Sequence, residues 1–260
     1  MRWSKPIKIS VVTTCYNSAS TIAETLASVA GQTHPDIEHI IVDGGSTDRT
    51  MDIVDRHRQR LAKVISEPDN GIYDAMNKGI ALASGDIVGF LNSDDQFASP
   101  LELEFVAKAF EDPHIDACHA DLVYVAERDP GRVVRYWKSG EYRPGRFRTG
   151  WMPAHPTFYV RRSVYQKFGG FDLQFHLQAD FELTMRLLEV HHIRSVHIPR
   201  VLVRMRVGGA TNSSLGNILK GNLEAYRACL KHGLPVTPFF MLRKILSRIP
   251  QFFSRQPDGR

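Results

Sequence analysis

Residues 85–97 read GDIVGFLNSDDQF, and this stretch sets the first question about the 260-residue chain. The apolar run from Ile87 to Leu91 has the length and composition of a buried strand. It leads directly into two adjacent acids, Asp94 and Asp95. Because neighbouring carboxylates repel each other, the end of this strand needs a partner of opposite charge, and the rest of the chain indicates which one.

Strand and helix patterns alternate over the first hundred residues. Parallel neighbours need a crossover connection, so this order predicts a mostly parallel sheet in an α/β fold. We expect strands at 7–14, 37–42, 63–67 and 87–91, and helices at 21–31, 48–61 and 72–85. Later in the chain we expect helices at 103–110, 180–188 and 215–232, strands at 115–126, 132–137 and 201–207, and a loop over 138–156.

Each of the first four expected strands ends in small, polar or acidic residues. These ends are TCYN at 14–17, DGGS at 43–46, EPDNG at 67–71 and NSDD at 92–95. Sheets of this kind bind ligands beyond the carboxyl ends of their strands, so the four ends predict a single polar crevice. A divalent cation between the acids and an anionic substrate would make the acidic pair tolerable, and oxygen ligands favour Mg²⁺ or Mn²⁺. The alternative is an ordinary surface turn.

Composition narrows the class of protein without choosing a substrate. The net charge of +5 suits nucleic acid, anionic lipid or a phosphorylated ligand, but no nucleic-acid recognition pattern is present, so we expect no such partner. Three widely spaced cysteines predict reduced thiols. The N-terminus lacks the apolar region of a signal peptide, and no run reaches the roughly 18 apolar residues of a membrane helix. We therefore expect a cytoplasmic protein.

Three segments resemble the nucleotide-binding half of a family 2 glycosyltransferase. They are ISVVTTCYNSASTIAETLASVAGQT (9–33), IIVDGGSTDRT (40–50) and DNGIYDAMNKGIALASGDIVGFLNSDD (69–95). The chain is similar in particular to the short bacterial enzymes that assemble cell-surface polysaccharides and glycolipids. The resemblance implies a GT-A-type, Rossmann-like fold with a mostly parallel central sheet, flanking helices and a C-terminal helical extension.

The resemblance also suggests a division of the chain. Residues 1–212 would form the GT-A catalytic domain, with a nucleotide-binding half at 1–98 and an acceptor half at 99–212. Residues 213–260 would form a basic, amphipathic helical extension. Bulky apolar and basic residues alternate over 238–255, a composition typical of a helix that rests on anionic lipid at the inner face of the membrane. A tail packed on its own domain is the alternative.

The family's nucleotide-binding roles can be placed on matching positions. Thr14 and Tyr16 resemble residues that flank the base and ribose, and Asp43 resembles the carboxylate that accepts a hydrogen bond from the base. Asp69 and Asn77 match positions that line the same pocket. The alternatives are that Asp43 is a turn residue and that Asn77 is a polar residue on a helix surface.

The resemblance assigns the metal and the catalytic base as well. Asp95 would bind the metal that bridges the diphosphate, and Asp94 would contact ribose or sugar, although the motif lacks the spaced Asp-x-Asp pattern and leaves this division open. Sugar transfer needs a base to take the proton of the acceptor hydroxyl. Asp180 matches the family's base, Glu182 is the second choice, and a helix cap is the alternative role for Asp180.

Three further residues are candidates for the acceptor or the diphosphate. His155 in MPAHPTF would shape the acceptor pocket, unless it is a structural loop residue. Arg204 and Arg206 lie on one face of the strand expected at 201–207 and could reach a phosphate. A solvated strand face is the alternative for both arginines.

The resemblance thus implies an inverting, metal-dependent glycosyltransferase. It would move a sugar from a nucleotide-sugar donor to a lipid-linked or saccharide acceptor in cell-surface polysaccharide or glycolipid biosynthesis. One alternative is nucleotidyl transfer onto a sugar phosphate, but the Gly-rich basic loop typical of that class is absent after the first strand, at 14–18. The other is a non-catalytic subunit that binds a nucleotide-sugar or a glycan.

Overall fold

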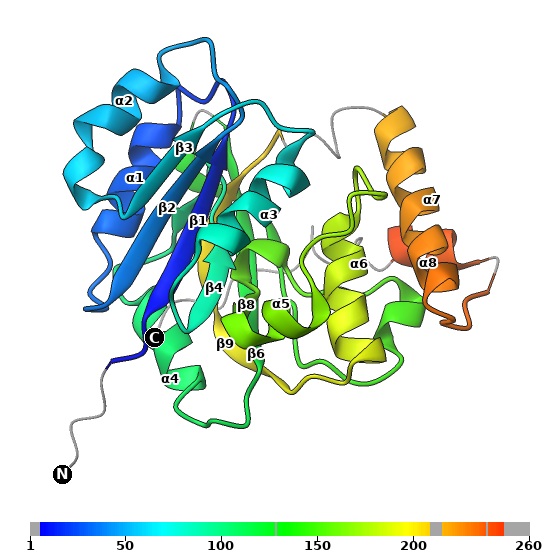
Figure 1. Cartoon of the computed structure of the whole chain (residues 1–260). Coiled ribbons are helices and arrows are strands. Elements are labelled where there is room, and N and C mark those ends of the chain that lie inside the picture. The colour runs from blue at the N-terminus through cyan, green and yellow to red at the C-terminus, as the bar shows by residue number, and fades with distance from the viewer. Residues whose placement is uncertain (1–5, 128, 209–214, 238, 247–260) are drawn as a thin grey trace.

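A central sheet organises the molecule in the computed structural model, which describes residues 6–127, 129–208, 215–237 and 239–246 (Figure 1). Over these residues the strand order is β3-β2-β1-β4-β8-β6-β9-β5, and β7 pairs with β6. The strands are β1 (Ile9–Cys15), β2 (Ile37–Asp43), β3 (Lys63–Ser66), β4 (Ile87–Phe90), β5 (Gln96–Phe97), β6 (Ala117–Ala126), β7 (Asp129–Trp137), β8 (Tyr159–Arg161) and β9 (Ser195–Arg206).

Most strands of the sheet run in one direction. The strands β3, β2, β1 and β4 are mutually parallel, and β6 is parallel to β9. Strand β8 is antiparallel to both β4 and β6, so β6 and β9 share the direction of the first four strands. Only β5, β7 and β8 run the other way among the described strands. The predicted α/β fold with a mostly parallel sheet is confirmed.

Helices cover both faces of the sheet. They are α1 (Ile22–Ala30), α2 (Thr50–Arg56), α3 (Ile72–Leu82), α4 (Glu102–Ala109), α5 (Arg162–Phe168), α6 (Ala179–Met185), α7 (Leu215–Lys231) and α8 (Phe240–Leu246). The connection over 138–156, predicted as a loop, contains only the short 3-10 turn Arg146–Thr149 and the start of a second turn, His155–Thr157.

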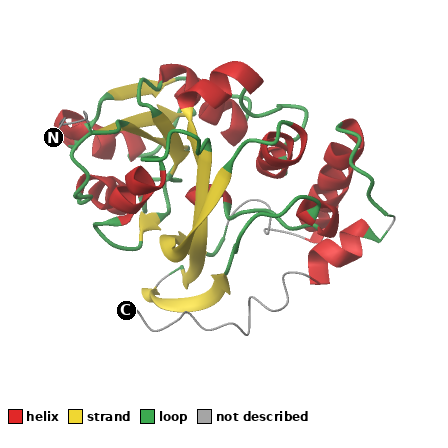
Figure 2. Ribbon diagram, turned by 90° about the horizontal axis from the view of Figure 1, so that it is seen from below, coloured by secondary structure: helices red, strands yellow, loops and turns green. Residues whose placement is uncertain are grey.

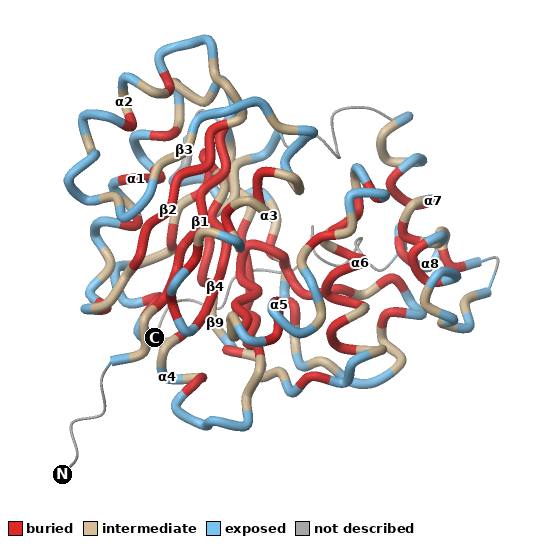
Figure 3. Tube along the Cα trace, in the orientation of Figure 1, coloured by how far each residue is buried: buried red, intermediate tan, exposed pale blue. Residues whose placement is uncertain are grey.

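Alternation along the strands explains this two-sided cover. Successive side chains of a strand point to opposite faces, so a parallel strand must be apolar on both. Val12 belongs to the same buried cluster as Met76 of α3, whereas Ile41 belongs to a cluster with Leu26 of α1 and Val54 of α2. Figure 3 shows the resulting buried interior of β1, β2 and β4.

Helices α6, α7 and α8 lie together at the end of the molecule away from α1 and α2 (Figures 1 and 2). Ala228 of α7 and Phe240 of α8 share the buried cluster of α6, and Lys244 of α8 is wholly buried. The described part of the tail therefore packs on the rest of the protein. Residue 238 and residues 247–255 of the predicted membrane segment lie outside the described residues. Among the described helices, none is long and apolar enough to cross a membrane.

Three local predictions differ from the structure. Helix α5 and the two-residue strand β5 were not predicted, and β9 begins at Ser195 rather than at 201. Pro199 interrupts the pattern of β9, and its pairing with β6 shifts register after Ala120. Thr21 does precede α1, but its side chain makes no capping hydrogen bond and instead donates to the Ser18 carbonyl at 3.4 Å.

Candidate active site

The loops that follow β1, β2 and β4 are tied together at the carboxyl end of the sheet. Asn17 adopts a positive φ of 48°, and its side-chain oxygen accepts the Thr47 N–H at 2.9 Å. The Asn17 N–H donates to Ser46 Oγ at 2.8 Å. The hydroxyls of Ser18 and Ser93 are 2.8 Å apart. The predicted convergence of the strand ends is therefore present.

Asp43 is the centre of the DGGS turn. Its buried carboxylate accepts the Gly45 N–H at 3.2 Å, the Ser46 N–H at 3.0 Å and the Ser66 hydroxyl at 2.7 Å, together with the Ser46 hydroxyl. Burial alone would raise the pKa of Asp43, but the hydrogen bonds from Ser46 and Ser66 lower it. Because these donors already occupy the carboxylate, the placement favours the turn role over the predicted contact with a nucleotide base.

The carboxylate of Asp69 lies against the same DGGS turn, with Oδ2 beside Gly44. A Cβ added to Gly44 would stand 2.5 Å from Asp69 Oδ2, so the absent side chain at 44 makes room for this carboxylate. Asp69 Oδ1 accepts the Gly71 N–H at 2.8 Å.

Directly after β1, Tyr16 leaves 63% of its surface exposed. Thr14 is buried, and its hydroxyl has no hydrogen-bond partner among the described residues.

The contacts of Asn77 disfavour the role predicted for it. Its Nδ2 donates to the Phe171 carbonyl at 2.9 Å, and its Oδ1 accepts the Phe171 N–H at 2.8 Å. Both ends of the amide are therefore used to join α3 to a loop 94 residues later in the chain. Asn77 bridges α3 and this loop, and its place in the nucleotide pocket stays a prediction.

The two adjacent acids have different surroundings. Asp95 is wholly buried, and its carboxylate accepts Asn92 Nδ2 at 3.2 Å and the Arg206 N–H at 3.3 Å. Burial and the charge of Asp94 raise the pKa of Asp95 well above its usual value. Asp94 is half-buried, and burial raises its pKa too. No side chain in the described parts of the chain hydrogen-bonds to the Asp94 carboxylate, so Asp94 is the more accessible acid.

Arg206 lies beside the acids but is held elsewhere. Its guanidinium forms an ion pair with Glu24 and donates to the Glu127 carbonyl at 2.8 Å. The backbone of Arg206, rather than its side chain, hydrogen-bonds to Asp95. Arg204 pairs with Gln96 of β5 across the sheet. The predicted phosphate contact is thus disfavoured for Arg206 and stays a prediction for Arg204.

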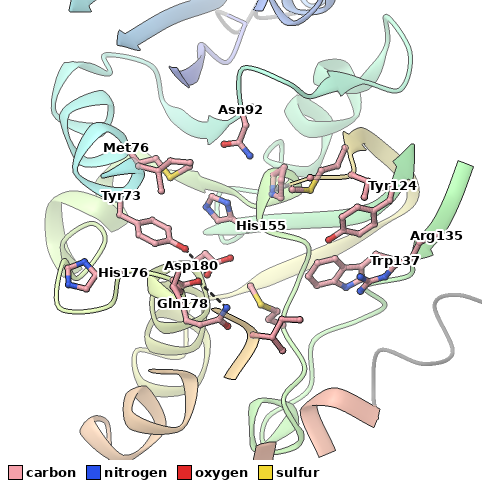
Figure 4. A pocket seen from close by; sticks show the side chains of 18 of the residues that line it. Tyr73, Met76, Asn92, Tyr124, Arg135, Trp137, His155, His176, Gln178 and Asp180 are labelled. Carbon is pink, nitrogen blue, oxygen red and sulfur yellow. Dashed lines mark hydrogen bonds between the residues drawn. The ribbon is translucent and has the colours of Figure 1, made fainter. Parts of the chain in front are cut away.

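A cavity of about 570 Å³ includes in its lining Asn92, the residue of the NSDD motif that donates to Asp95 (Figure 4). Asp180, His155 and Asn92 line it, so two residues predicted for catalysis and the acceptor do meet there. The Tyr73 hydroxyl donates to Asp180 Oδ1 at 3.1 Å, and the same oxygen accepts the Phe181 N–H at 2.8 Å. No group in the described ranges donates to Asp180 Oδ2, which leaves that oxygen for a ligand.

His155 and Tyr73 complete the surroundings of Asp180. The His155 ring stacks on Phe90 with a centroid distance of 5.6 Å and meets the edge of Phe171 at 5.6 Å. Burial lowers the pKa of His155, so the imidazole is neutral near pH 7. Burial and the Asp180 charge raise the pKa of Tyr73 well above its usual value, so its hydroxyl remains a hydrogen-bond donor.

Glu182, the second choice for the base, is occupied by structural contacts. Its buried carboxylate accepts Arg186 Nε at 2.7 Å and lies 2.7 Å from His232 Nε2. It does not line the cavity. Within the acidic helix α6, Asp180 is therefore the carboxylate that faces the open space.

Several residues of the cavity were not predicted. Asn92 belongs to the NSDD motif and Gln178 lies two residues before Asp180, yet the sequence alone selects only the acids. Tyr73 is the second residue of α3, and nothing in the sequence links it to Asp180, which follows 107 residues later. Its role depends on the tertiary structure.

Metal-binding groups were sought over the described residues. No cluster of three or more His, Cys, Asp or Glu side chains that could hold a metal occurs there. The three cysteines, Cys15, Cys118 and Cys229, are free and buried. A cation at the acidic pair would therefore draw most of its oxygen ligands from a substrate and from water.

Comparison with known sequences places these features in a family. The model of glycosyl transferase family 2 matches residues 10–169. An uncharacterized glycosyltransferase of Mycobacterium tuberculosis is 33% identical over 189 residues, which cover 68% of each chain. A PGL/p-HBAD biosynthesis glycosyltransferase of Mycobacterium bovis is 30% identical over 182 residues, again 68% of each chain.

Solved structures share the fold at lower identity. Staphylococcus aureus TarS 1-349 in complex with UDP has a TM-score of 0.63 and 21% identity over 88% of this chain and 67% of the TarS chain. The mannosyltransferase PcManGT from Pyrobaculum calidifontis, in complex with GDP-Man and Mn²⁺, has a TM-score of 0.66 and 18% identity over 96% of this chain and 74% of its own. The fold is thus of the GT-A type.

Proposed function

The chain belongs to glycosyl transferase family 2 and is a glycosyltransferase, and we propose that it moves a sugar from a nucleotide donor to an acceptor hydroxyl by a metal-assisted, inverting displacement. The observation that carries this proposal is that Asp180 lines the same cavity as Asn92, whose side chain donates a hydrogen bond to Asp95 of the acidic pair. Asp180 lies beyond the region matched by the family model, so the structure rather than the motif supports its role.

We propose that Asp94, rather than Asp95, would hold the metal, which exchanges the two roles predicted from the sequence. The Asp94 carboxylate is half-buried and receives no hydrogen bond from a described side chain, whereas Asn92 and Arg206 occupy that of Asp95. A lone carboxylate that shares the ion with diphosphate oxygens and water suits Mg²⁺ or Mn²⁺. When bound, the ion would neutralise charge on the leaving diphosphate.

Asp180 would act as the base. Its Oδ1 is fixed by Tyr73 and by the N–H of Phe181, and this leaves Oδ2 to accept the proton of the acceptor hydroxyl. The acceptor oxygen attacks the anomeric carbon as the bond to the diphosphate breaks, and a single displacement inverts the configuration at that carbon. Neutral His155, which lines the cavity beside Asp180, would orient the acceptor.

The nucleotide would lie over the ends of β1 and β2. The exposed ring of Tyr16 offers a stacking surface for a base, and Thr14 brings a hydroxyl without a described partner. We propose that Asp69, rather than Asp43, accepts from the base, because the donors of the DGGS turn occupy Asp43. Since similar structures bind UDP and GDP-Man, UDP- and GDP-sugars are the first donors to test.

A contact with anionic membrane would bring a lipid-linked acceptor to the cavity at the cytosolic face. Beside the buried Phe240 and Lys244, the tail leaves Phe239, Ile245 and Leu246 exposed. Co-sedimentation with phosphatidylglycerol vesicles tests this contact, with phosphatidylcholine vesicles as the neutral control. Equal recovery with both lipids would argue against it.

The proposed function is tested by release of nucleoside diphosphate from a panel of nucleotide-sugars with Mn²⁺, Mg²⁺ or EDTA. We expect turnover that requires the metal and falls roughly 100-fold or more in Asp94→Asn. Asp95→Asn should mainly lower the melting temperature, because Asp95 is buried among structural partners. Wild-type turnover in both variants with every donor would contradict the mechanism, and loss in Asp95→Asn alone would contradict the exchange of roles.

A further inference from the structure

The cavity changes character on the side opposite Asp180 and Tyr73 (Figure 4). Tyr124 of β6 lies beside Arg135 of β7 on one flank and Met205 of β9 on the other, because these residues are register partners. Partners in register point to the same face of a sheet. Together with Trp137 and Val207, which also line the cavity, these three residues form a surface that we call the aromatic wall.

The aromatic wall is flat and ordered by ring contacts. The rings of Tyr124 and Trp137 are within 6° of parallel, with centroids 6.4 Å apart. The guanidinium of Arg135 lies 4.7 Å from the Tyr124 centroid and 5.6 Å from that of Trp137. The guanidinium of Arg135 is therefore engaged by both rings, and the rest of the surface offered to a ligand is largely apolar.

Apolar side chains also line the mouth of the cavity. Ile72, Val134 and Val207 line it and yet expose 47%, 38% and 46% of their surface to solvent. The deeper lining is apolar as well and includes Met76, Met152, Leu177 and Ile218. An apolar rim around a deep cavity is typical of a ligand site, because leaving such side chains in water is unfavourable.

Polar groups are concentrated near Asp180. The amide of Gln178 is already engaged, since its Oε1 accepts from Lys244 and its Nε2 donates to the Leu177 carbonyl at 3.0 Å. The polar groups of the aromatic wall are the Arg135 guanidinium, which lies against the Tyr124 ring, the Tyr124 hydroxyl and the Trp137 indole N–H. A saccharide buried there would leave hydroxyls without partners, which is costly, whereas an apolar group would not.

We propose that the acceptor carries an apolar aglycone, which lies on the aromatic wall. A hydroxyl of the aglycone, or of a sugar attached to it, reaches Asp180. This inference rests on the proposed function and narrows the acceptor from lipid-linked or saccharide compounds to those with an apolar group. In the transfer the acceptor oxygen bonds to the anomeric carbon, the bond to the diphosphate breaks, and the proton passes to Asp180. An aromatic ring and an alkyl chain are both apolar, so each fits this description of the aglycone.

The test compares three glucosides that differ only in aglycone: methyl, phenyl and octyl β-D-glucoside, the last below its critical micelle concentration. Their dissociation constants are measured by calorimetry without donor. Each buried methylene strengthens binding about fourfold, so we expect phenyl or octyl glucoside to bind at least about tenfold more tightly than methyl glucoside. A gain for phenyl alone identifies a ring, and a gain for octyl alone identifies a chain.

Two variants place that preference on the aromatic wall. Trp137→Ala and Val134→Asp should each reduce the gain to less than about threefold, so that the remaining preference is at most roughly 0.65 kcal/mol. Val133→Asp is the matched control, because Val133 is equally exposed at 39% on the same strand but does not line the cavity. Equal binding of all three glucosides, or a preference that survives both variants, overturns the inference. Donor turnover is measured separately. Wild-type turnover together with equal binding of the three glucosides would contradict the apolar aglycone but not the proposed sugar transfer.

Discussion

At the scale of single residues, the surroundings of Asp180 distinguish it from the other acids that the sequence offers. Three acids of similar standing in the sequence, Asp43, Asp95 and Glu182, prove to be buried and occupied by structural donors. Asp180 instead holds one oxygen against Tyr73 and presents the other to the cavity. The hydrogen-bond partners separate a catalytic acid from a structural one.

Removing the Tyr73 hydroxyl should slow the reaction without weakening donor binding. Its hydrogen bond orients the Asp180 carboxylate, and a bond to a charged group contributes about 1.5–3 kcal/mol. We expect Tyr73→Phe to lower kcat by about tenfold or more, with the donor KM nearly unchanged. Steady-state kinetics with the best donor of the panel measures both constants.

Tyr165→Phe serves as the control for that variant. The Tyr165 hydroxyl is also buried, but it has no hydrogen-bond partner among the described residues. Its removal should leave kcat unchanged and the melting temperature equal or higher, because no bond is lost. A similar loss of kcat in both variants would show that Tyr73 acts through packing alone.

Single residues also mark the limit of sequence interpretation. The acidic pair, Asp180 and His155 could be selected from local motifs. Asp180 and His155 line one cavity, together with Asn92, which hydrogen-bonds to Asp95. Asn77 could not be interpreted, because its partner Phe171 is 94 residues away. The occupation of Asp43 by Ser66 likewise depends on the pairing of β2 with β3.

At the scale of elements, helix α7 supports the segment that leads to Asp180. Glu224 Oε2 accepts the N–H groups of Leu177 at 2.7 Å and Gln178 at 3.0 Å. Helix α7 can approach Gln178 closely because Gly221 has no side chain, and a Cβ at position 221 would lie 3.3 Å from Gln178 Nε2. Glu224 is thus a positioning residue for the start of α6.

Glu224→Ala should leave two N–H groups without an acceptor, at a cost of about 1–3 kcal/mol of stability. We expect kcat to fall by about tenfold because the start of α6 shifts, while the donor KM changes little. Glu224→Gln keeps an acceptor oxygen and should recover most of the activity. Lys231→Ala removes the Asp172 ion pair on the same helix and is the control. Equal kcat in Glu224→Ala and Lys231→Ala would refute the positioning role.

Elements with a long local pattern could be predicted, and short ones could not. Strand β1 and helix α3 have clear periods and lie within a few residues of their expected ranges. Strand β5 has two residues and exists because it pairs with β9, about a hundred residues later. The aromatic wall is a property of three strands together, so no single segment indicates it.

At the scale of the whole molecule, Glu38 connects the amino ends of β1, β2 and β4, opposite the carboxyl ends where the candidate site lies. Its buried carboxylate accepts Ser10 Oγ at 2.6 Å and the Ser84 N–H at 2.7 Å, and Lys8 lies 3.2 Å away. Burial alone would raise the pKa of Glu38, but the hydrogen bonds of Ser10 and Ser84 lower it from 4.5 to about 2. The network connects β1, β2 and the approach to β4.

This lowered pKa predicts how stability depends on pH. The native state binds the Glu38 proton less tightly than the unfolded chain, so the stabilisation is complete above pH 4.5 and is lost as pH falls toward 2. Glu38→Gln should lower the free energy of unfolding at pH 7 by about 3 kcal/mol, and the deficit should shrink at acid pH. Urea titrations from pH 7 to 3 measure it, with exposed Glu111→Gln as the control. A deficit that does not change with pH would contradict this account.

The central claim is that Asp180 takes the acceptor proton while the donor is bound near Asp94. Its most direct test is the single-turnover rate of sugar transfer by Asp180→Asn at saturating donor, metal and acceptor. We predict a fall of about 10³-fold, because a positioned base contributes on that order, with donor affinity within threefold of wild type. A transfer rate within tenfold of wild type would contradict the claim.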